Sequence, residues 1–420
     1  MNHSLGSATI SRYDRDVAFT VALQASLMMA KNMLVSVSNG LLAINGILNL
    51  VLFVIIGCFY IRFFLRHKIR IVKSVVALLS AVAVFVLITF IIRPNLFSYP
   101  LVIQAMYLFA VNAVPVLLLF PRMNSVDALL EAFYKASFIL AFIDVLCVPL
   151  FFVNKNVGAI EDYSMSYGQA AMVQCVFLYS KFFRDRDLKA LALAVVANFC
   201  VFIVGSRFPL LCIGVFVVIK LLQRLKNSRY RFLLVLVPLV FLLIYFGQGY
   251  ILEALYKLLV SVGVQSRSLA YLTNGRLLYD SGRYVIHQVV YEALKKSPIL
   301  GYGFGGGYII VNGMTHSLVL DILCNLGIPA GLVFIAWFCI QYISKIRNNK
   351  NDKAYVELML LFGCLFLPKA FFGGELWETD KFWWVIALII MANHRLRRSR
   401  DTYEDPLRDR TLERTSYHSV

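Results

Sequence analysis

The sequence predicts an all-α integral membrane protein with about 12 transmembrane helices and one large extracytoplasmic loop containing amphipathic helices. Apolar residues make up 60% of the 420 residues and charged residues only 15%, whereas soluble domains have about 45–50% and about 25%. The mean hydropathy is +0.75. This composition excludes a soluble enzyme and a disordered chain, because one water-solvated domain cannot bury so much apolar surface.

The charge of the chain points to membrane topology rather than to nucleic acid. Lys and Arg total 41 against 23 Asp and Glu, which is a formal net charge of +18. A nucleic-acid-binding protein would gather its cations on one face, but here they form short clusters between apolar stretches. We therefore expect a lipid bilayer as a partner and no nucleic acid.

Twelve apolar stretches have about the length that crosses a hydrocarbon core about 30 Å thick. The first is weakened by Gln24 and Lys31, and the short seventh and eighth meet at 205–207, which predicts a tight hairpin. The predicted spans are 17–36, 41–61, 72–92, 101–120, 133–153, 165–183, 189–205, 208–223, 232–247, 316–343, 354–374 and 381–394.

The distribution of basic residues orients these spans. With a cytoplasmic N-terminus, most Lys and Arg fall in inner segments, and the short outer loops hold only Arg93, Lys155, Arg207 and Lys381. By the positive-inside rule, both termini are then cytoplasmic. We divide the chain into spans one to nine (1–247), an extracytoplasmic loop (248–315), spans ten to twelve (316–394) and a cytoplasmic tail predicted to be disordered (395–420). The first span would act as a signal anchor, and the eight Cys lie in spans, so no disulfide is expected.

The outer loop 248–315 has features of a functional segment, as long loops often do. Residues 251–262 and 284–296 have helical apolar spacing, so both could lie on the membrane surface. Ser281 is the expected N-cap of the second helix, and Pro298 and the run GYGFGGGY at 301–308 end it.

Four side chains stand out on the outer face of this topology, namely Arg207, Arg276, Arg283 and His316. Guanidinium groups bind phosphate in a bidentate way, and a helix N-terminus near Arg283 would add unpaired N–H groups. A diphosphate at the outer leaflet would suit such a site. His316 could accept a proton from an attacking hydroxyl, because the usual pKa of His lies near neutral pH.

The order of short motifs resembles the O-antigen polymerase and O-antigen ligase superfamily. Ser206-Arg207 lies at a span junction, SGR at 281–283 opens an outer helix, and SPILGYGFG (297–305), THS (315–317) and LDILCNLGIPAGL (320–332) follow. The similarity covers about 205–332, and the twelve-span plan agrees over the whole chain. The family often has His-Asn where this chain has His316-Ser317, which leaves the role of the second residue open.

The resemblance implies a membrane glycosyltransferase that acts on glycans carried by undecaprenyl diphosphate. Arg207 and Arg283 would bind the donor diphosphate and His316 would be the catalytic base, whereas Arg276 has no firm counterpart. Tyr302, Glu375 and Glu378 complete the substrate-binding candidates. The expected partners are lipid-linked donor and acceptor glycans, with a chain-length regulator and a flippase as further candidates, at the outer face of the cytoplasmic (inner) membrane.

A sugar hydroxyl would attack the anomeric carbon while undecaprenyl diphosphate leaves. No Asp-x-Asp motif lies on the outer side, so we expect Arg side chains to stabilise the leaving group. The sequence therefore predicts an inverting, metal-independent reaction without a cofactor.

Each candidate residue also has a simpler interpretation. Arg207 could snorkel to the headgroups, Arg276 could bind lipid phosphate, and His316 could cap its span. Glu375 and Glu378 could bind acceptor sugar or act as the base instead of His316. The glycines at 301–307 fit either a flexible turn or a close backbone approach to a glycan or phosphate.

Four functions compete. The leading one is polymerisation of lipid-linked repeat units into an O-antigen, capsule or exopolysaccharide. The nearest alternative is the O-antigen ligase of the same superfamily, which differs in its acceptor. A lipid-linked oligosaccharide flippase or transporter ranks lower, because the chain shows no repeated halves and its largest loop follows the ninth span. A non-catalytic scaffold is a further alternative, for which Arg283→Ala and His316→Ala would be harmless.

Overall fold

The fold is helical throughout the part of the chain that the structure describes. The structure is a computed structural model, and it describes residues 10–37, 42–68, 71–153, 165–204, 207–225 and 282–396, with a few positions within 253–273. No strand occurs in these ranges, which agrees with the predicted all-α class. Seven of the described helices are long and apolar enough to cross a membrane. The total of about 12 spans stays a prediction, because the ninth (232–247) lies outside the described residues.

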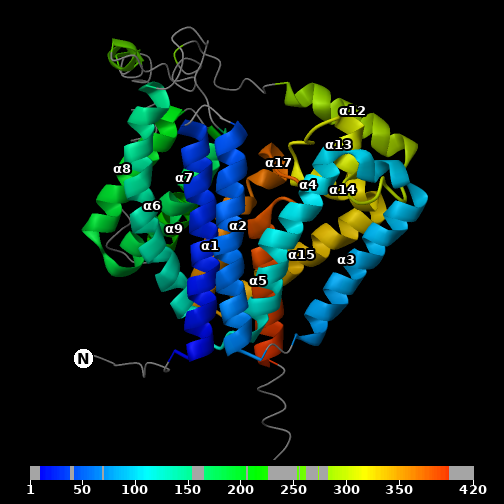
Figure 1. Ribbon diagram of the computed structural model, residues 1–420, viewed down its shortest axis with the longest axis horizontal. Coiled ribbons are helices and arrows are strands. Elements are labelled where there is room, and N and C mark those ends of the chain that lie inside the picture. Colours follow the sequence, from blue (N-terminus) through cyan, green and yellow to red (C-terminus); the bar gives the residue numbers. More distant parts are fainter. Residues whose placement is uncertain are drawn as a thin grey trace, which may run out of the picture.

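The first eight predicted spans correspond to helices with similar limits. Their bounds are α1 Arg12–Val37, α2 Leu42–Arg66, α3 Lys73–Ile92, α4 Pro100–Leu108 continuing into α5 Val114–Leu119, α6 Asp127–Val153, α7 Met165–Asp185, α8 Leu188–Val204 and α9 Arg207–Leu225. Most run roughly along one direction, and α3 is tilted away from the rest (Figure 1). The start of α1 and the end of the last helix, 380–396, lie at the same end of this bundle.

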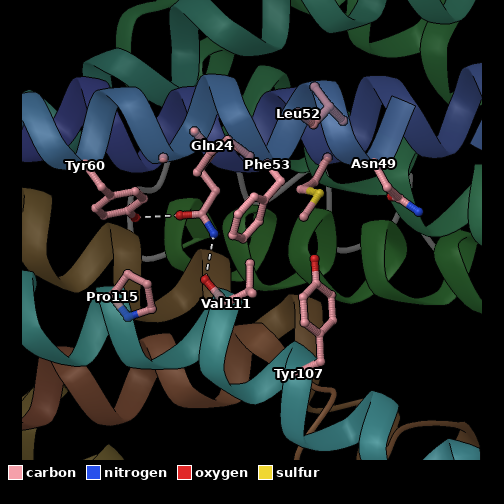
Figure 2. A pocket seen from close by; sticks show the side chains of 11 residues that line it. Gln24, Asn49, Leu52, Phe53, Tyr60, Tyr107, Val111 and Pro115 are labelled. Atoms are coloured by element: carbon pink, nitrogen blue, oxygen red, sulfur yellow. Dashed lines mark hydrogen bonds between the residues drawn. The ribbon is translucent and has the colours of Figure 1, made fainter. Parts of the chain in front are cut away.

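A π-helical turn, Phe109–Ala113, joins α4 to α5. Pro115 has no N–H for the carbonyl of Val111, so the normal helical hydrogen bond is missing there. The side chain of Gln24 in α1 donates to that carbonyl at 2.8 Å and accepts from the Tyr60 hydroxyl at 2.5 Å (Figure 2). The same side chains line a mostly apolar pocket of about 170 Å³ between α1, α2 and this segment, with Tyr107 on its opposite wall.

The predicted tenth span, 316–343, is wrong as a single helix. It consists of α14 Leu318–Leu326 and α15 Ile328–Asn348, separated by Gly327. Gly327 has a positive φ of 80°, which L side chains rarely adopt, and Pro329 begins α15 without needing a hydrogen-bond acceptor for its nitrogen. The Gly-Ile-Pro signal is visible in the sequence, but the continuous apolar run concealed it.

The predicted eleventh span is also interrupted. Helix α16 runs Lys353–Phe366, and a short α17, Lys369–Phe372, follows after Pro368. Residues 373–379, which we call the 373–379 turn, then lead into the helix 380–396 that corresponds to the predicted span 381–394. Much of this turn is buried, including Glu375, Leu376 and Trp377.

A buried ion-pair network ties four helices of the bundle together. Lys220 of α9 pairs with Glu357 of α16, which also accepts a hydrogen bond from Ser180 of α7. The hydroxyls of Ser180 and Tyr134 in α6 lie 2.8 Å apart. Because every charge in this network has a partner, its burial stabilises the packing of these helices rather than marking a reactive site.

The second amphipathic helix predicted in the loop is confirmed. Helix α12 spans Arg283–Lys296 and lies across the end of the bundle opposite to the start of α1 (Figure 1). The expected N-cap was Ser281, but Gly282 occupies this position with a φ of 81° and no side-chain hydrogen bond. Of the other predicted helix, 251–262, the structure describes residues 253, 254 and 256–261, and all of them are helical.

Candidate functional site

The first residue of α12 lies near His316. His316 belongs to the 312–317 loop, between α13 (Gly306–Val311) and α14, and is partly buried. Burial lowers the pKa of His316, and the nearby charge of Arg283 and the ring of His287 lower it further. The imidazole is therefore neutral at neutral pH and able to accept a proton.

The backbone of His316 is held in an uncommon conformation. Its φ is +56°, in the left-handed region that few residues other than glycine adopt. Such a conformation costs about 1–3 kcal/mol and persists only where the surroundings enforce it. The N–H of His316 donates to Glu375 Oε1 at 3.2 Å, which connects this loop to the 373–379 turn.

Glu375 of the 373–379 turn and Asp321 of α14, which we call the carboxyl pair, connect that turn to the 312–317 loop and to α14. Glu375 is 1% exposed, and both of its oxygens lie 3.1 Å from the Thr315 hydroxyl, which donates to them. Asp321 in α14 is fully buried and its Oδ2 accepts from the N–H of Leu376 at 2.8 Å. Each carboxyl therefore receives an N–H from the segment opposite its own.

Burial raises the pKa of Glu375 well above its usual value, and the neighbouring carboxyl of Asp321 raises it further. Burial also raises the pKa of Glu378, which lies near the Tyr308 hydroxyl. Asp321 Oδ1, Glu378 Oε1, the Tyr308 hydroxyl and the Thr379 hydroxyl are all buried without a hydrogen-bond partner. Such unsatisfied atoms are rare in folded proteins and often mark functional sites.

The glycine-rich segment 301–307 packs against the end of α14 rather than forming an open turn. The N–H groups of Tyr302 and Gly303 donate to the carbonyls of Cys324 and Asn325 at 2.6 and 3.1 Å. A Cβ at Gly301 would lie 2.4 Å from the backbone nitrogen of Gly327, so only glycine fits. The close backbone approach seen at Gly301 is to the end of α14 and the Gly327 junction.

The predicted site residues differ in how far the structure describes them. Arg283 and His316 are near each other, whereas Arg276 and the side chain of Arg207 lie outside the described part, so their roles stay predictions. Tyr302 donates from its hydroxyl to the Ala293 carbonyl at 2.9 Å, and Arg93 lies 4.6 Å from its ring centre. Glu375 and Glu378 are not on the surface: Glu375 is buried and bonded to the 312–317 loop, and Glu378 is partly buried.

Sequence reasoning missed two features of this region. Nothing in the sequence pattern singled out His287, which lies near His316 and has a buried Nε2. The pairing of Asp321 with Glu375 was also missed, because 53 intervening residues separate the two along the chain. The one available signal was an ionisable residue, Asp321, inside an apolar stretch, which is a reason to suspect function.

A comparison with protein families supports the resemblance seen in the motifs. Residues 190–335 match the family model described as O-Antigen ligase, and this range contains Arg207, Arg276, Arg283 and His316. The match supports placing the chain in the O-antigen ligase and polymerase superfamily and points to a membrane enzyme that transfers glycosyl groups. A search of curated proteins finds no significant match.

Proposed function

We propose that this protein polymerises oligosaccharide repeat units carried on undecaprenyl diphosphate into a surface polysaccharide. The observation that carries the proposal is the proximity of Arg283, at the start of α12, to a His316 whose imidazole is neutral. A guanidinium at a helix N-terminus suits a diphosphate, and a neutral imidazole beside it suits the removal of a hydroxyl proton. The family match agrees with this class of reaction.

In the proposed reaction, His316 takes the proton of a sugar hydroxyl on the acceptor. The oxygen forms a new bond to the anomeric carbon of the donor while the bond to the diphosphate oxygen breaks, which inverts the configuration at that carbon. The released undecaprenyl diphosphate keeps the bonding electrons. Arg283, together with the predicted Arg207 and Arg276, would stabilise its developing charge without a metal ion.

The site is proposed to lie on the extracytoplasmic side of the inner membrane, with both termini cytoplasmic. Helix α12 and the 312–317 loop lie at the end of the bundle opposite to the start of α1, which supports this arrangement (Figure 1). Lys345 and Arg347 in the last turn of α15 also agree with the positive-inside rule, because α15 leads away from the site.

The second candidate is the ligase, which transfers a finished glycan to lipid A-core. The description of the matching family as O-Antigen ligase favours it. The two enzymes would share the donor diphosphate and differ in the acceptor, so Arg283 and His316 fit both.

The surface glycan of a deletion strain tests both candidates. Single repeat units indicate a lost polymerase, and long chains stranded on the carrier lipid indicate a lost ligase. A normal glycan would contradict both. Purified protein in liposomes then separates enzyme from flippase, since an enzyme lengthens or transfers glycans placed on one side and a flippase only relocates them. Activity that disappears with a chelator would contradict the metal-independent mechanism.

A further inference from the structure

The carboxyl pair is an unusual arrangement for two acids in a protein interior. Both side chains are at least 99% buried, and the structure places no cation against either carboxylate among the described hydrogen bonds and ion pairs. Two adjacent carboxylates without a counter-ion repel each other strongly where the dielectric is low. Among the described groups nothing offsets this repulsion, which favours a proton on one of the two carboxyls at neutral pH.

The hydrogen bonds indicate which carboxyl carries it. Asp321 Oδ2 accepts from the Leu376 N–H, but Asp321 Oδ1 is buried with no partner. Glu375 is the neighbouring acid, because the N–H of Leu376, the next residue, donates to Asp321 Oδ2 and each carboxyl acts on the pKa of the other. A proton on Glu375 Oε2 would give Asp321 Oδ1 its missing donor, and Glu375 Oε1 would still accept the N–H of His316.

The other charged and titratable groups around the pair do not neutralise it. Tyr308 of α13, Cys324 of α14 and Glu378 of the 373–379 turn interact with the pair, and each is neutral or acidic. Lys369 of α17 acts on Glu378. Arg283 and His287 of α12 act on the His316 ring.

We propose that Glu375 and Asp321 share a single proton, carried by Glu375 and donated to Asp321 Oδ1, and that this bond holds His316 in its left-handed backbone conformation. The protonated pair bridges the 312–317 loop, α14 and the 373–379 turn. Ionisation of Glu375 would place two negative charges in contact and open this bridge. Glu375 is then a positioning residue, and its effect on glycan transfer rests on the function proposed above.

Glutamine is the isostere of the protonated state, which makes the decisive variant Glu375→Gln. Its amide N–H can donate to Asp321 Oδ1 and its oxygen can accept from His316, while the Thr315 hydroxyl turns to the Ser317 carbonyl at 3.1 Å. We expect E375Q to retain transfer at neutral pH and E375A to lose about tenfold or more, because E375A leaves buried donors unpaired. If Glu375 were instead the catalytic base, E375Q would be as inactive as E375A, which would overturn the proposal.

A second readout does not depend on any enzymatic activity. The infrared spectrum of the purified full-length protein in lipid nanodiscs should contain a protonated carboxylic acid band at neutral pH that weakens in E375Q. The matched control is E292Q, since Glu292 is exposed on α12 and pairs with Lys295 at 2.6 Å. A wild-type spectrum in which E375Q removes no such band would show that Glu375 does not carry the proton and would overturn the proposal.

The pH dependence of thermal stability in the same samples shows whether protonation of Glu375 stabilises the folded protein. The pKa of Glu375 is higher in the folded protein than in the unfolded chain, so its contribution to stability is present at low pH and is lost as pH rises through the raised value. Wild type and E292Q should lose stability with rising pH more steeply than E375Q. Equal slopes would contradict the proposal. If the band and slopes behave as expected but no glycan transfer occurs in any assay, the shared proton stands and the proposed function fails.

Discussion

Two of the buried polar clusters in the described part of this protein are built in opposite ways. In the ion-pair network of the bundle, Lys220 faces Glu357, the Ser180 hydroxyl donates to the same carboxylate, and the Tyr134 hydroxyl bonds to Ser180. In the cluster that contains the carboxyl pair, two carboxyls lie together, and four polar atoms have no hydrogen-bond partner in the described structure. The first cluster is satisfied and holds helices together. The second cluster contains polar atoms without hydrogen-bond partners. A proton or a substrate that pairs with such atoms changes the energy of the cluster.

This difference predicts that substitutions in the first cluster mainly affect stability and that substitutions near His316 mainly affect glycan transfer. Removing a member of the satisfied network leaves a buried charge alone, so the main cost should be to folding. Removing a group near His316 should affect transfer more than folding. Four measurements test this division.

The largest effect is expected for His316→Ala. Loss of a general base lowers rate by about 10²–10⁴-fold, and because the ring is only partly buried, the melting temperature should change little. Transfer by purified protein and its thermal unfolding would be measured together. The control is H67A: His67 lies in the α2–α3 connection and its Nε2 is 2.8 Å from Asp16. Equal losses of transfer in both variants would contradict a special role for His316.

A large loss of stability is expected for Glu357→Ala, because Lys220 would remain buried without a partner. The expected destabilisation is about 3–5 kcal/mol, with transfer per folded molecule preserved, and denaturation in detergent would measure it. The matched control is E131A. Glu131 makes more exposed ion pairs with Lys181 and Arg184 at 3.6 and 3.4 Å, which should contribute about 1 kcal/mol or less. Equal destabilisation by the two variants would contradict the assignment of the Lys220 network as structural.

A shift in pH dependence is expected for Arg283→Gln. The charge of Arg283 lowers the pKa of His316, so removing it raises that pKa. The base is then protonated at a higher pH, and the acidic limb of the kcat/KM profile moves to higher pH, in addition to any loss of diphosphate binding. R283K keeps the charge and should leave the limb in place. If the acidic limb of the kcat/KM profile does not move in R283Q, the pH dependence of kcat/KM does not report the titration of His316.

The smallest effect is expected for the double variant K220M/E357L. Replacing both members of a buried ion pair with apolar residues of similar size is often neutral or stabilising by about 1–4 kcal/mol. The double variant should therefore unfold at or above the wild-type temperature, in contrast to E357A. Destabilisation as large as that of E357A would mean that the charges themselves specify the packing of α9 against α16.

Part of the fold follows directly from composition and periodicity. Apolar stretches of about 20 residues have few alternatives to membrane helices, so the helices α1 to α9 agree with the predicted spans. The amphipathic spacing of Tyr284 to Lys296 likewise predicts α12. The interruptions at Gly327 and Pro368 were not predicted, because the continuous apolar runs concealed the local Gly and Pro signals. The short motifs were sufficient to suggest a superfamily that the match at 190–335 supports.

The sequence by itself determined the helical class, the apolar bundle and the candidates Arg283 and His316. These follow from local properties, namely hydrophobicity, helical period and side-chain chemistry. Only the tertiary structure decided that Asp321 and Glu375 lie side by side and that His316 is held at a positive φ. Those features depend on contacts between segments far apart along the chain, and the pKa of a carboxyl is set by the neighbours and burial that such contacts create.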